Sequence, residues 1–81
     1  MKKKILITGG AGYIGSKLST KLLDLNHEVT VVDILKFSSK SLNHLFNYKN
    51  FTFVKGDVRN KKLMRSLIKK NEFIIPLAAL G

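Results

Sequence analysis

A glycine-rich segment near the amino terminus constrains the fold of this chain more than any other feature. Residues 8–15, TGGAGYIG, follow a β-branched apolar run at 4–8 and lead into a segment of helical periodicity at 13–25. A strand, a glycine-rich turn and a helix together form the opening unit of a dinucleotide-binding α/β fold. The glycines match G-x-G-x-x-G at Gly10, Gly12 and Gly15, and they match G-x-x-G-x-x-G from Gly9.

The spacing of these glycines suits a backbone that a phosphate group approaches closely. A Cβ atom would obstruct that approach, and the N–H groups and positive dipole end of the following helix would stabilise the negative charge. We therefore expect this turn to hold the pyrophosphate of a dinucleotide. The alternative is a glycine-rich turn between a strand and a helix that binds no ligand. The expected binding residues are Gly9, Gly12, Tyr13, Ile14 and Gly15.

Strands and helices alternate along the rest of the chain. A short helix is expected at 41–46, and a second helix is expected after Asn60, a residue type that caps helix amino termini. Strands joined by helices form parallel sheets through right-handed crossovers. The pattern predicts an α/β fold over residues 1–81, the amino-terminal half of a Rossmann domain, with four parallel strands in the order 3-2-1-4 and flanking helices. After the first strand, the expected strands are 28–33, 51–55 and 72–77.

The first helix has one apolar stripe and a distinct end. Its leucine and isoleucine residues fall at i, i+4, i+8 and i+11, which is one face of a helix. Asn26 follows, and asparagine tolerates the left-handed backbone conformation that a carboxyl-terminal cap needs. The spacing therefore predicts a helix that ends at Asn26. The residues of the stripe are Ile14, Leu18, Leu22 and Leu25.

The second expected strand ends in an acidic residue, Asp33. It lies eighteen positions after Gly15, close to the spacing of about 20 that is typical of the acid that binds the adenosine ribose. A carboxylate accepts hydrogen bonds from both ribose hydroxyls and repels the 2′-phosphate of NADP. Asp33 therefore favours NAD as the cofactor. The alternative is a solvated aspartate at a strand end.

Four motifs resemble those of the extended short-chain dehydrogenase/reductase family, especially its nucleotide-sugar epimerases and dehydratases. The resemblance covers the whole chain, and the motifs occur in the family's order. One position departs from the pattern: Pro76 stands where a histidine is more usual before Leu-Ala-Ala. The motifs are TGGAGYIG at 8–15, VVD at 31–33, GDVR at 56–59 and LAA at 77–79.

The resemblance implies roles for residues that the spacing alone does not assign. Asp57 and Val58 are implied to meet the adenine of NAD. Leu77, Ala78 and Ala79 are implied to line the cofactor between the pyrophosphate and the nicotinamide ribose. Without the resemblance, Asp57 would be read as a turn residue or a solvated acid.

The resemblance also implies hydride transfer assisted by a Tyr-x-x-x-Lys pair, in which the lysine lowers the pKa of the tyrosine. We expect that pair beyond residue 81, so that this chain binds NAD without catalysis and meets a nucleotide sugar only in a full-length enzyme. Tyr13 and Lys17 match the pattern. They belong to the phosphate loop and first helix, however, and are not expected to be catalytic. His27 and His44 are interpreted as an isolated helix-end histidine and an isolated surface histidine.

The charge balance bears on possible partners. Fifteen lysine and arginine residues stand against five acidic residues, for a net charge of +10. The lysines are spread over several elements, which favours solvated faces over a nucleic-acid interface. The alternative function is a stand-alone nucleotide-binding or regulatory module, without catalysis, that associates with nucleic acid through this charge.

The remaining composition excludes some classes of site. The chain has no cysteine, which excludes disulfides, zinc–thiolate sites and thiol nucleophiles. The apolar run at the start is too short for a signal peptide or a membrane span, so we expect a cytoplasmic protein. The fourth expected strand, 72–77, is apolar almost throughout. If its edge is uncovered, self-association through this strand is expected, because unpaired N–H and C=O groups pair with other chains.

Overall fold

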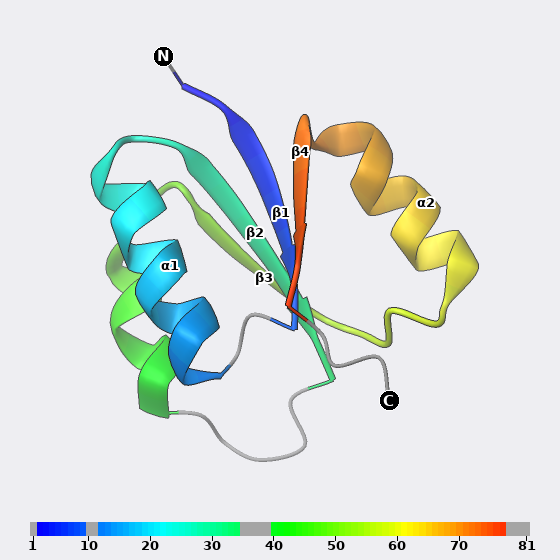
Figure 1. Cartoon of the computed structure of the whole chain (residues 1–81), viewed down its shortest axis with the longest axis horizontal. Helices are drawn as coiled ribbons and strands as arrows, with labels where there is room; N and C mark the ends of the chain where they lie inside the picture. Colours follow the sequence, from blue (N-terminus) through cyan, green and yellow to red (C-terminus); the bar gives the residue numbers. More distant parts are fainter. Residues whose placement is uncertain (1, 10–11, 35–39, 78–81) are drawn as a thin grey trace.

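The computed structural model describes residues 2–9, 12–34 and 40–77. Strands and helices alternate as the sequence pattern predicts (Figure 1). The elements are β1 (Lys4–Thr8), α1 (Tyr13–Asp24), β2 (Glu28–Asp33), the 3₁₀ helix η1 (Lys40–Asn47), β3 (Phe51–Lys55), α2 (Lys61–Lys70) and β4 (Phe73–Pro76).

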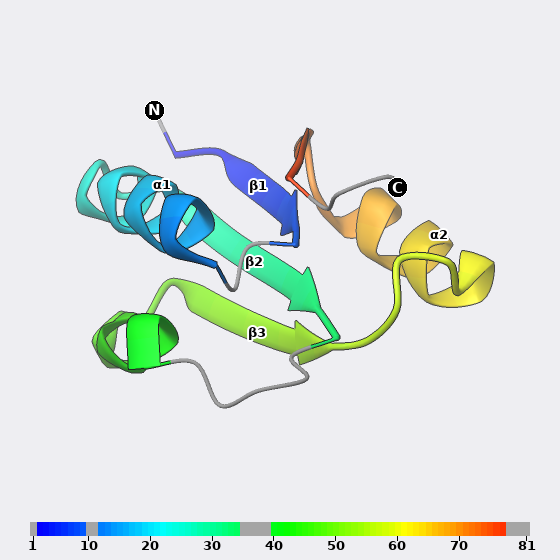
Figure 2. The same cartoon turned by 60° about the horizontal axis from the view of Figure 1, so that its bottom comes forward.

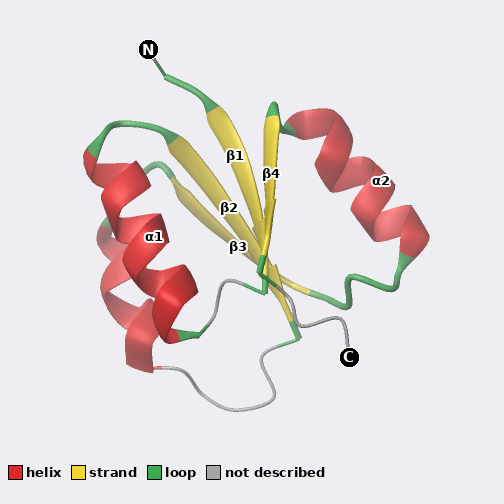
Figure 3. Ribbon diagram, in the orientation of Figure 1, coloured by secondary structure: helices red, strands yellow, loops and turns green. Residues whose placement is uncertain are grey.

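The four strands form one parallel sheet in the order β3-β2-β1-β4, which confirms the predicted topology (Figure 3). After β3 the chain crosses back over β2 and β1 through α2, so that β4 pairs with the free side of β1. Two views show α1 and η1 on one face of the sheet and α2 on the other (Figures 1 and 2). The chain therefore folds as three layers.

The side chains of β1 alternate between two clusters because both faces of the strand are covered. Ile5 and Ile7 point toward α1 and η1, whereas Leu6 points toward α2. This double burial explains why β1 is a continuous apolar run rather than an alternating one. The buried residues of the first cluster are Ile5, Ile7, Leu23, Val29, Val31, Leu42 and Leu45, and those of the second are Leu6, Val32 and Leu67.

The packing of α1 differs from the predicted apolar stripe. Leu18 and Leu22 are only partly buried against the core, and the ends of the stripe are exposed, Ile14 at 71% and Leu25 at 61%. The prediction holds for Leu18 and Leu22, which pack against the core, and is wrong for Ile14 and Leu25, because a neighbouring face of α1 that contains Leu23 is the most buried one. The buried residues of α1 are Gly15, Ser16, Ser19 and Leu23.

Two predicted caps are present. Asn26 has a φ of 68° after the last turn of α1, the left-handed conformation expected of a carboxyl-terminal cap. The Asn60 side chain accepts a hydrogen bond from the Leu63 N–H at 3.1 Å, which caps the amino terminus of α2. Asn26 therefore marks the carboxyl end of α1, and Asn60 marks the amino end of α2.

The segment expected as a short helix is the 3₁₀ helix η1. Leu42 and Leu45 are 2% and 0% exposed and lie three residues apart, the spacing that stacks side chains on one side of a 3₁₀ helix. The two leucines anchor η1 to the core beside α1. Burial of these two leucines stabilises the helix, although most of the residues around them are polar.

Leu45→Ala is expected to destabilise the fold much more than Leu25→Ala, although both substitutions remove the same atoms. Leu45 is 0% exposed and Leu25 is 61% exposed. Truncating a buried leucine costs about 2–5 kcal/mol, against a total of roughly 4–12 kcal/mol for a chain of this length. Urea titration followed by far-ultraviolet circular dichroism measures both losses. Equal losses would show that η1 does not pack on the core.

Candidate functional site

The carboxyl ends of the parallel strands meet at one edge of the sheet, and backbone hydrogen bonds join the residues that follow them. The Gly9 N–H, after β1, donates to the Val32 carbonyl in β2 at 2.8 Å. The Leu77 N–H, after β4, donates to the Thr8 carbonyl in β1 at 2.8 Å. From β1 the chain continues to β2 on one side of β1, and β4 later pairs with the other side of β1. Ligands of open α/β sheets bind where the strand order reverses in this way.

Gly9 and Gly12 require glycine for different reasons. Gly9 has a φ of 74°, which a residue with a Cβ rarely adopts, so the turn itself needs glycine there. Gly12 has a φ of −82° and a ψ of −177°, which any residue can adopt. A Cβ on Gly12 would meet no atom of the described residues within 4 Å. Neither backbone strain nor packing therefore explains Gly12, whereas a ligand in close contact with the backbone would.

The start of α1 is open to an anion. Gly12 is the amino-terminal cap residue and has no side chain to accept a hydrogen bond from the first turn. That turn contains no acidic residue, so no carboxylate there compensates the positive end of the helix. In α2, by contrast, Asn60 makes such a bond. A phosphate group at the start of α1 would occupy the place that a capping side chain takes elsewhere.

A cavity of about 430 Å³ lies at this turn. It combines five residues of the glycine-rich segment with the residue that follows β4. Gly10 and Ala11, and the predicted site residues Ala78 and Ala79, lie outside the described part of the chain. The cavity is lined by Gly9, Gly12, Tyr13, Ile14, Gly15 and Leu77.

The other predicted site residues lie further along the same edge. Asp33 is the last residue of β2 and is half-buried, and its neighbour in register on β3 is Lys55. The Gly56 N–H donates to the Asp33 carbonyl at 3.0 Å, which brings the Gly56-Asp57-Val58 turn beside the end of β2. Asp33, Asp57 and Val58 do not line the cavity at the glycine turn. Asp57 and Val58 belong to the turn between β3 and α2, and Val58 packs against the cluster of Leu6, Val32 and Leu67.

Arg59 binds the Asp57 carboxylate, a contact that the sequence analysis did not identify. The Arg59 backbone N–H donates to Oδ1 at 2.8 Å. Its Nε donates to Oδ1 at 3.1 Å and to Oδ2 at 3.0 Å, and its terminal nitrogen donates to Oδ2 at 2.7 Å. These hydrogen bonds, together with the charge of Asp57, raise the pKa of Arg59. The only sequence signal was the short separation of the two residues in GDVR, where Val58 alone lies between them.

Tyr13 and Lys17 lie on the first turns of α1 and contact each other. Lys17 Nζ lies 4.8 Å from the centroid of the Tyr13 ring, within the range of a cation–π interaction. Tyr13 is 69% exposed and lines the cavity at the glycine turn. The pair therefore belongs to the glycine turn and the first helix.

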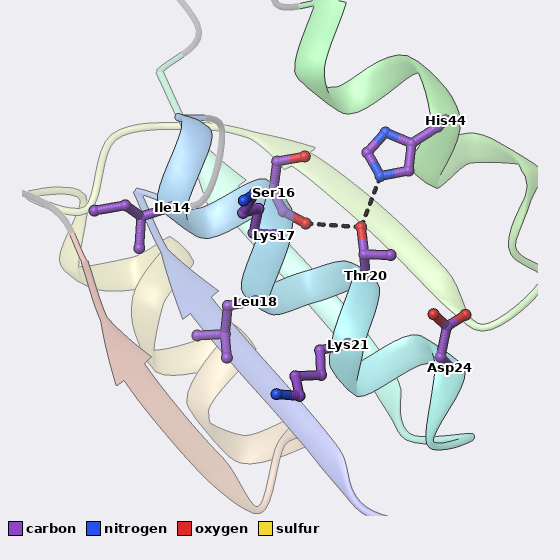
Figure 4. A pocket seen from close by; sticks show the side chains of 8 residues that line it. All are labelled: Ile14, Ser16, Lys17, Leu18, Thr20, Lys21, Asp24 and His44. Carbon is purple, nitrogen blue, oxygen red and sulfur yellow. Dashed lines mark hydrogen bonds between the residues drawn. The ribbon is translucent and has the colours of Figure 1, made fainter.

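A second cavity, of about 630 Å³, lies along α1 and is lined by residues of that helix and by His44 of η1 (Figure 4). The Thr20 hydroxyl donates to the Ser16 carbonyl at 2.8 Å and lies 2.6 Å from His44 Nε2. The Thr20 hydroxyl thus contacts both its own helix and His44 of η1. His44 is exposed as predicted, but its interpretation as an isolated histidine was wrong. Nothing in the sequence signals a contact that only the docking of η1 on α1 creates.

A further bond joins α1 to Tyr48, the residue that follows η1. The Tyr48 hydroxyl donates to Asp24 Oδ1 at 2.6 Å, and this hydrogen bond, with desolvation and the Asp24 charge, raises the pKa of Tyr48. His27 is also bonded, because its Nδ1 accepts from the Lys3 N–H at 3.1 Å. The predicted isolation of His27 at the helix end was therefore wrong as well.

Two kinds of feature are absent from the described residues. No group of three or more histidine or acidic side chains there could hold a metal ion. No helix there is long and apolar enough to cross a membrane.

The glycine turn and the strand order agree with a comparison to protein families. The family described as the NAD dependent epimerase/dehydratase family matches residues 5–81. The chain belongs to this family. The motifs that suggested the resemblance all lie within the matched range.

Relatives within the family span different reactions. The chain is 38% identical over 80 residues to a UDP-N-acetyl-alpha-D-glucosaminuronate decarboxylase of Bacillus cytotoxicus, a match that covers 99% of this chain and 25% of that protein. It is 37% identical over 82 residues to a UDP-glucose 4-epimerase of Klebsiella pneumoniae, covering 95% of this chain and 59% of that protein. The chain therefore spans only part of the length of these family members.

A solved structure of the same fold contains a cofactor. The Bordetella bronchiseptica enzyme WbmH, in complex with NAD⁺, matches 100% of this chain and 27% of its own length. The TM-score is 0.85 and the sequence identity is 30%. The four-stranded parallel sheet and its helices are thus those of Rossmann-type members of the family.

Gly12→Ala is expected to leave the fold intact and to weaken NAD binding at least tenfold, about 1.4 kcal/mol. The new Cβ enters open space in the protein, and its effects on the unfolded chain and on the helix cap oppose each other, at about 1 kcal/mol each. Urea denaturation and calorimetric titration with NAD measure the two quantities.

Gly56→Ala is the matched control. A Cβ at Gly56 would overlap the Leu63 side chain, so this variant should lose stability, by about 1–3 kcal/mol. If Gly12→Ala destabilises the chain as much as Gly56→Ala, Gly12 serves the fold and not a ligand. Unchanged affinity for NAD in Gly12→Ala would lead to the same conclusion.

Proposed function

We propose that this chain is the NAD-binding portion of a nucleotide-sugar epimerase or dehydratase. The observation that carries the proposal is the open space at Gly12, beside a helix start that has no side-chain cap. Membership of the family and the NAD⁺ in the related WbmH structure support it. The proposed ligand at the glycine turn is the pyrophosphate, with Gly9, Gly12, Tyr13, Ile14 and Gly15 around it.

The strand order supports an assignment for the rest of the cofactor. Along the sheet edge, the strands run β3, β2, β1, β4. An extended dinucleotide runs adenine, ribose, pyrophosphate, nicotinamide ribose. With the pyrophosphate at the end of β1, the adenosine ribose lies at Asp33, the last residue of β2. The proposed site is completed by Asp57 and Val58 at the adenine and by Leu77, Ala78 and Ala79 toward the nicotinamide.

The proposed substrate of the whole protein is a nucleotide sugar. Both relatives named above act, by their names, on UDP-linked sugars, one as a decarboxylase and the other as an epimerase. Because these two reactions differ, the region that the two relatives share with this chain indicates the cofactor better than it indicates the reaction. The proposal therefore assigns NAD binding to these residues and leaves the sugar to the rest of the enzyme.

On residues 1–81 we propose binding without turnover. The pattern Tyr-x-x-x-Lys occurs there only at Tyr13 and Lys17. Tyr13 lines the cavity assigned to the pyrophosphate, and Lys17 lies over its ring. Neither residue is then at the nicotinamide, where hydride transfer takes place.

NAD is expected to bind more tightly than NADP, because the Asp33 carboxylate accepts from the ribose hydroxyls and repels a 2′-phosphate. The expected difference is on the order of 1–3 kcal/mol, about 5- to 150-fold in affinity. Calorimetric titration of the chain with each dinucleotide measures it, and Asp33→Ala should remove most of the difference. Equal affinities in the unsubstituted chain, or a preference for NADP, would refute the role of Asp33.

Self-association through β4 is a second expected outcome. β4 is the outer strand of the described sheet, and its apolar side chains are unusually accessible, with Phe73 at 51% and Ile74 at 43%. Ile74→Lys should reduce self-association, because a charge on an edge strand opposes pairing with another chain. Sedimentation at several concentrations measures the change.

Ile68→Lys is the matched control, since Ile68 is 46% exposed but lies on α2. It should leave self-association unchanged. If the two variants behave alike, general hydrophobic adhesion and not the strand edge is responsible. A chain that is monomeric at high concentration before any substitution would refute the expectation.

A further inference from the structure

Arg59 and Asp57 are joined by several hydrogen bonds although both side chains lie at the surface. Three N–H groups of Arg59 reach back two residues to both oxygens of one carboxylate, at 2.7 to 3.1 Å. The side chains are 84% and 35% exposed, respectively. An ion pair as exposed as this contributes little to folding stability. Its main physical effect is to fix the orientation of the Asp57 carboxylate.

The position of this carboxylate follows from the sheet. Gly56 donates to the Asp33 carbonyl, so the turn that carries Asp57 lies beside the end of β2. If Asp33 holds the adenosine ribose, as proposed above, the base attached to that ribose extends away from β1 and over the end of β3. The carboxylate of Asp57 belongs to the turn that follows β3 directly.

The chemistry of a fixed carboxylate distinguishes between purine bases. A carboxylate only accepts hydrogen bonds, and its two oxygens have about four acceptor sites. Adenine presents an amino group at C6, which donates, whereas hypoxanthine presents a carbonyl oxygen at C6, which a carboxylate repels. The planar guanidinium group of Arg59 binds both carboxylate oxygens at once and so fixes the plane of the carboxylate group, which a lysine ammonium cannot do.

We propose that Arg59 is a positioning residue that holds the Asp57 carboxylate as the acceptor for the amino group of adenine, and that it thereby makes the chain select adenine dinucleotides over 6-oxopurine dinucleotides. The inference rests on the proposed function, because it assigns the base specificity of the same site. Arg59 acts through Asp57, and its effect is on the choice between bases more than on the strength of binding.

The test is calorimetric titration of the chain with NAD and with nicotinamide hypoxanthine dinucleotide, which differ only at C6 and N1 of the base. The unsubstituted chain should prefer NAD by on the order of tenfold, the value of one hydrogen bond to a charged group. Arg59→Lys keeps the charge but loses the fork, and should reduce the preference at least threefold. Asp57→Asn can donate to the 6-oxo group and should abolish or reverse the preference.

Arg65→Lys is the matched control, since Arg65 lies exposed on α2 and should leave the ratio of the two affinities unchanged. The ratio is the decisive measurement, because general loss of structure would weaken both ligands alike. Urea midpoints of all variants are measured beside it.

The outcomes separate the two levels of the proposal. If the unsubstituted chain binds neither dinucleotide, the proposed function and this inference both fail. If the chain binds NAD but Arg59→Lys lowers both affinities equally, Arg59 supplies only charge and the inference alone fails. A gain in NAD affinity in Arg59→Ala would also overturn it, because Arg59 would then compete with adenine for the carboxylate.

Discussion

Burial of β1 on both faces is the constraint on which the rest of the structure depends. Ile5 and Ile7 belong to one cluster and Leu6 to the other, so helices must cover both sides of the strand. The parallel pairing of β1 with β2 and β4 follows from the crossovers that place those helices. Because β1 is fixed by these contacts, the turn that follows it is held at the edge where the strand order reverses.

The glycine turn illustrates how a fold can leave a place for a ligand. Gly9 is needed for the conformation of the turn, and Gly15 is buried in α1. Gly12 has a backbone conformation that any residue can adopt, and a Cβ there would meet no atom of the described residues within 4 Å. The helix start beside it has no capping side chain. A bound phosphate would accept the hydrogen bonds that a capping side chain accepts in other helices, and the open space at Gly12 leaves room for it.

The parts of the site that sequence could predict are those that depend on local chemistry. The glycine spacing, the acid at the end of β2 and the caps Asn26 and Asn60 need only a few neighbouring residues to be recognised. The contact of Arg59 with Asp57 is also local, but nothing in the residue types indicates which of several surface charges will pair. It became visible only when the side-chain geometry was known.

By itself, the sequence determined the order of the elements, because hydrophobic periodicity acts over short stretches of chain, and it indicated the parallel sheet, because strands that alternate with helices join through right-handed crossovers. Tertiary structure alone decided which apolar residues form the core. Leu25 fits the predicted stripe and is exposed, whereas Leu45 lies in a polar segment and is fully buried. The contact of Thr20 with His44 was decided in the same way. Burial depends on which faces of α1 and η1 pack against the sheet, and that is decided by contacts between residues far apart in the sequence, such as Ile5, Leu23 and Leu45, which no local pattern reports.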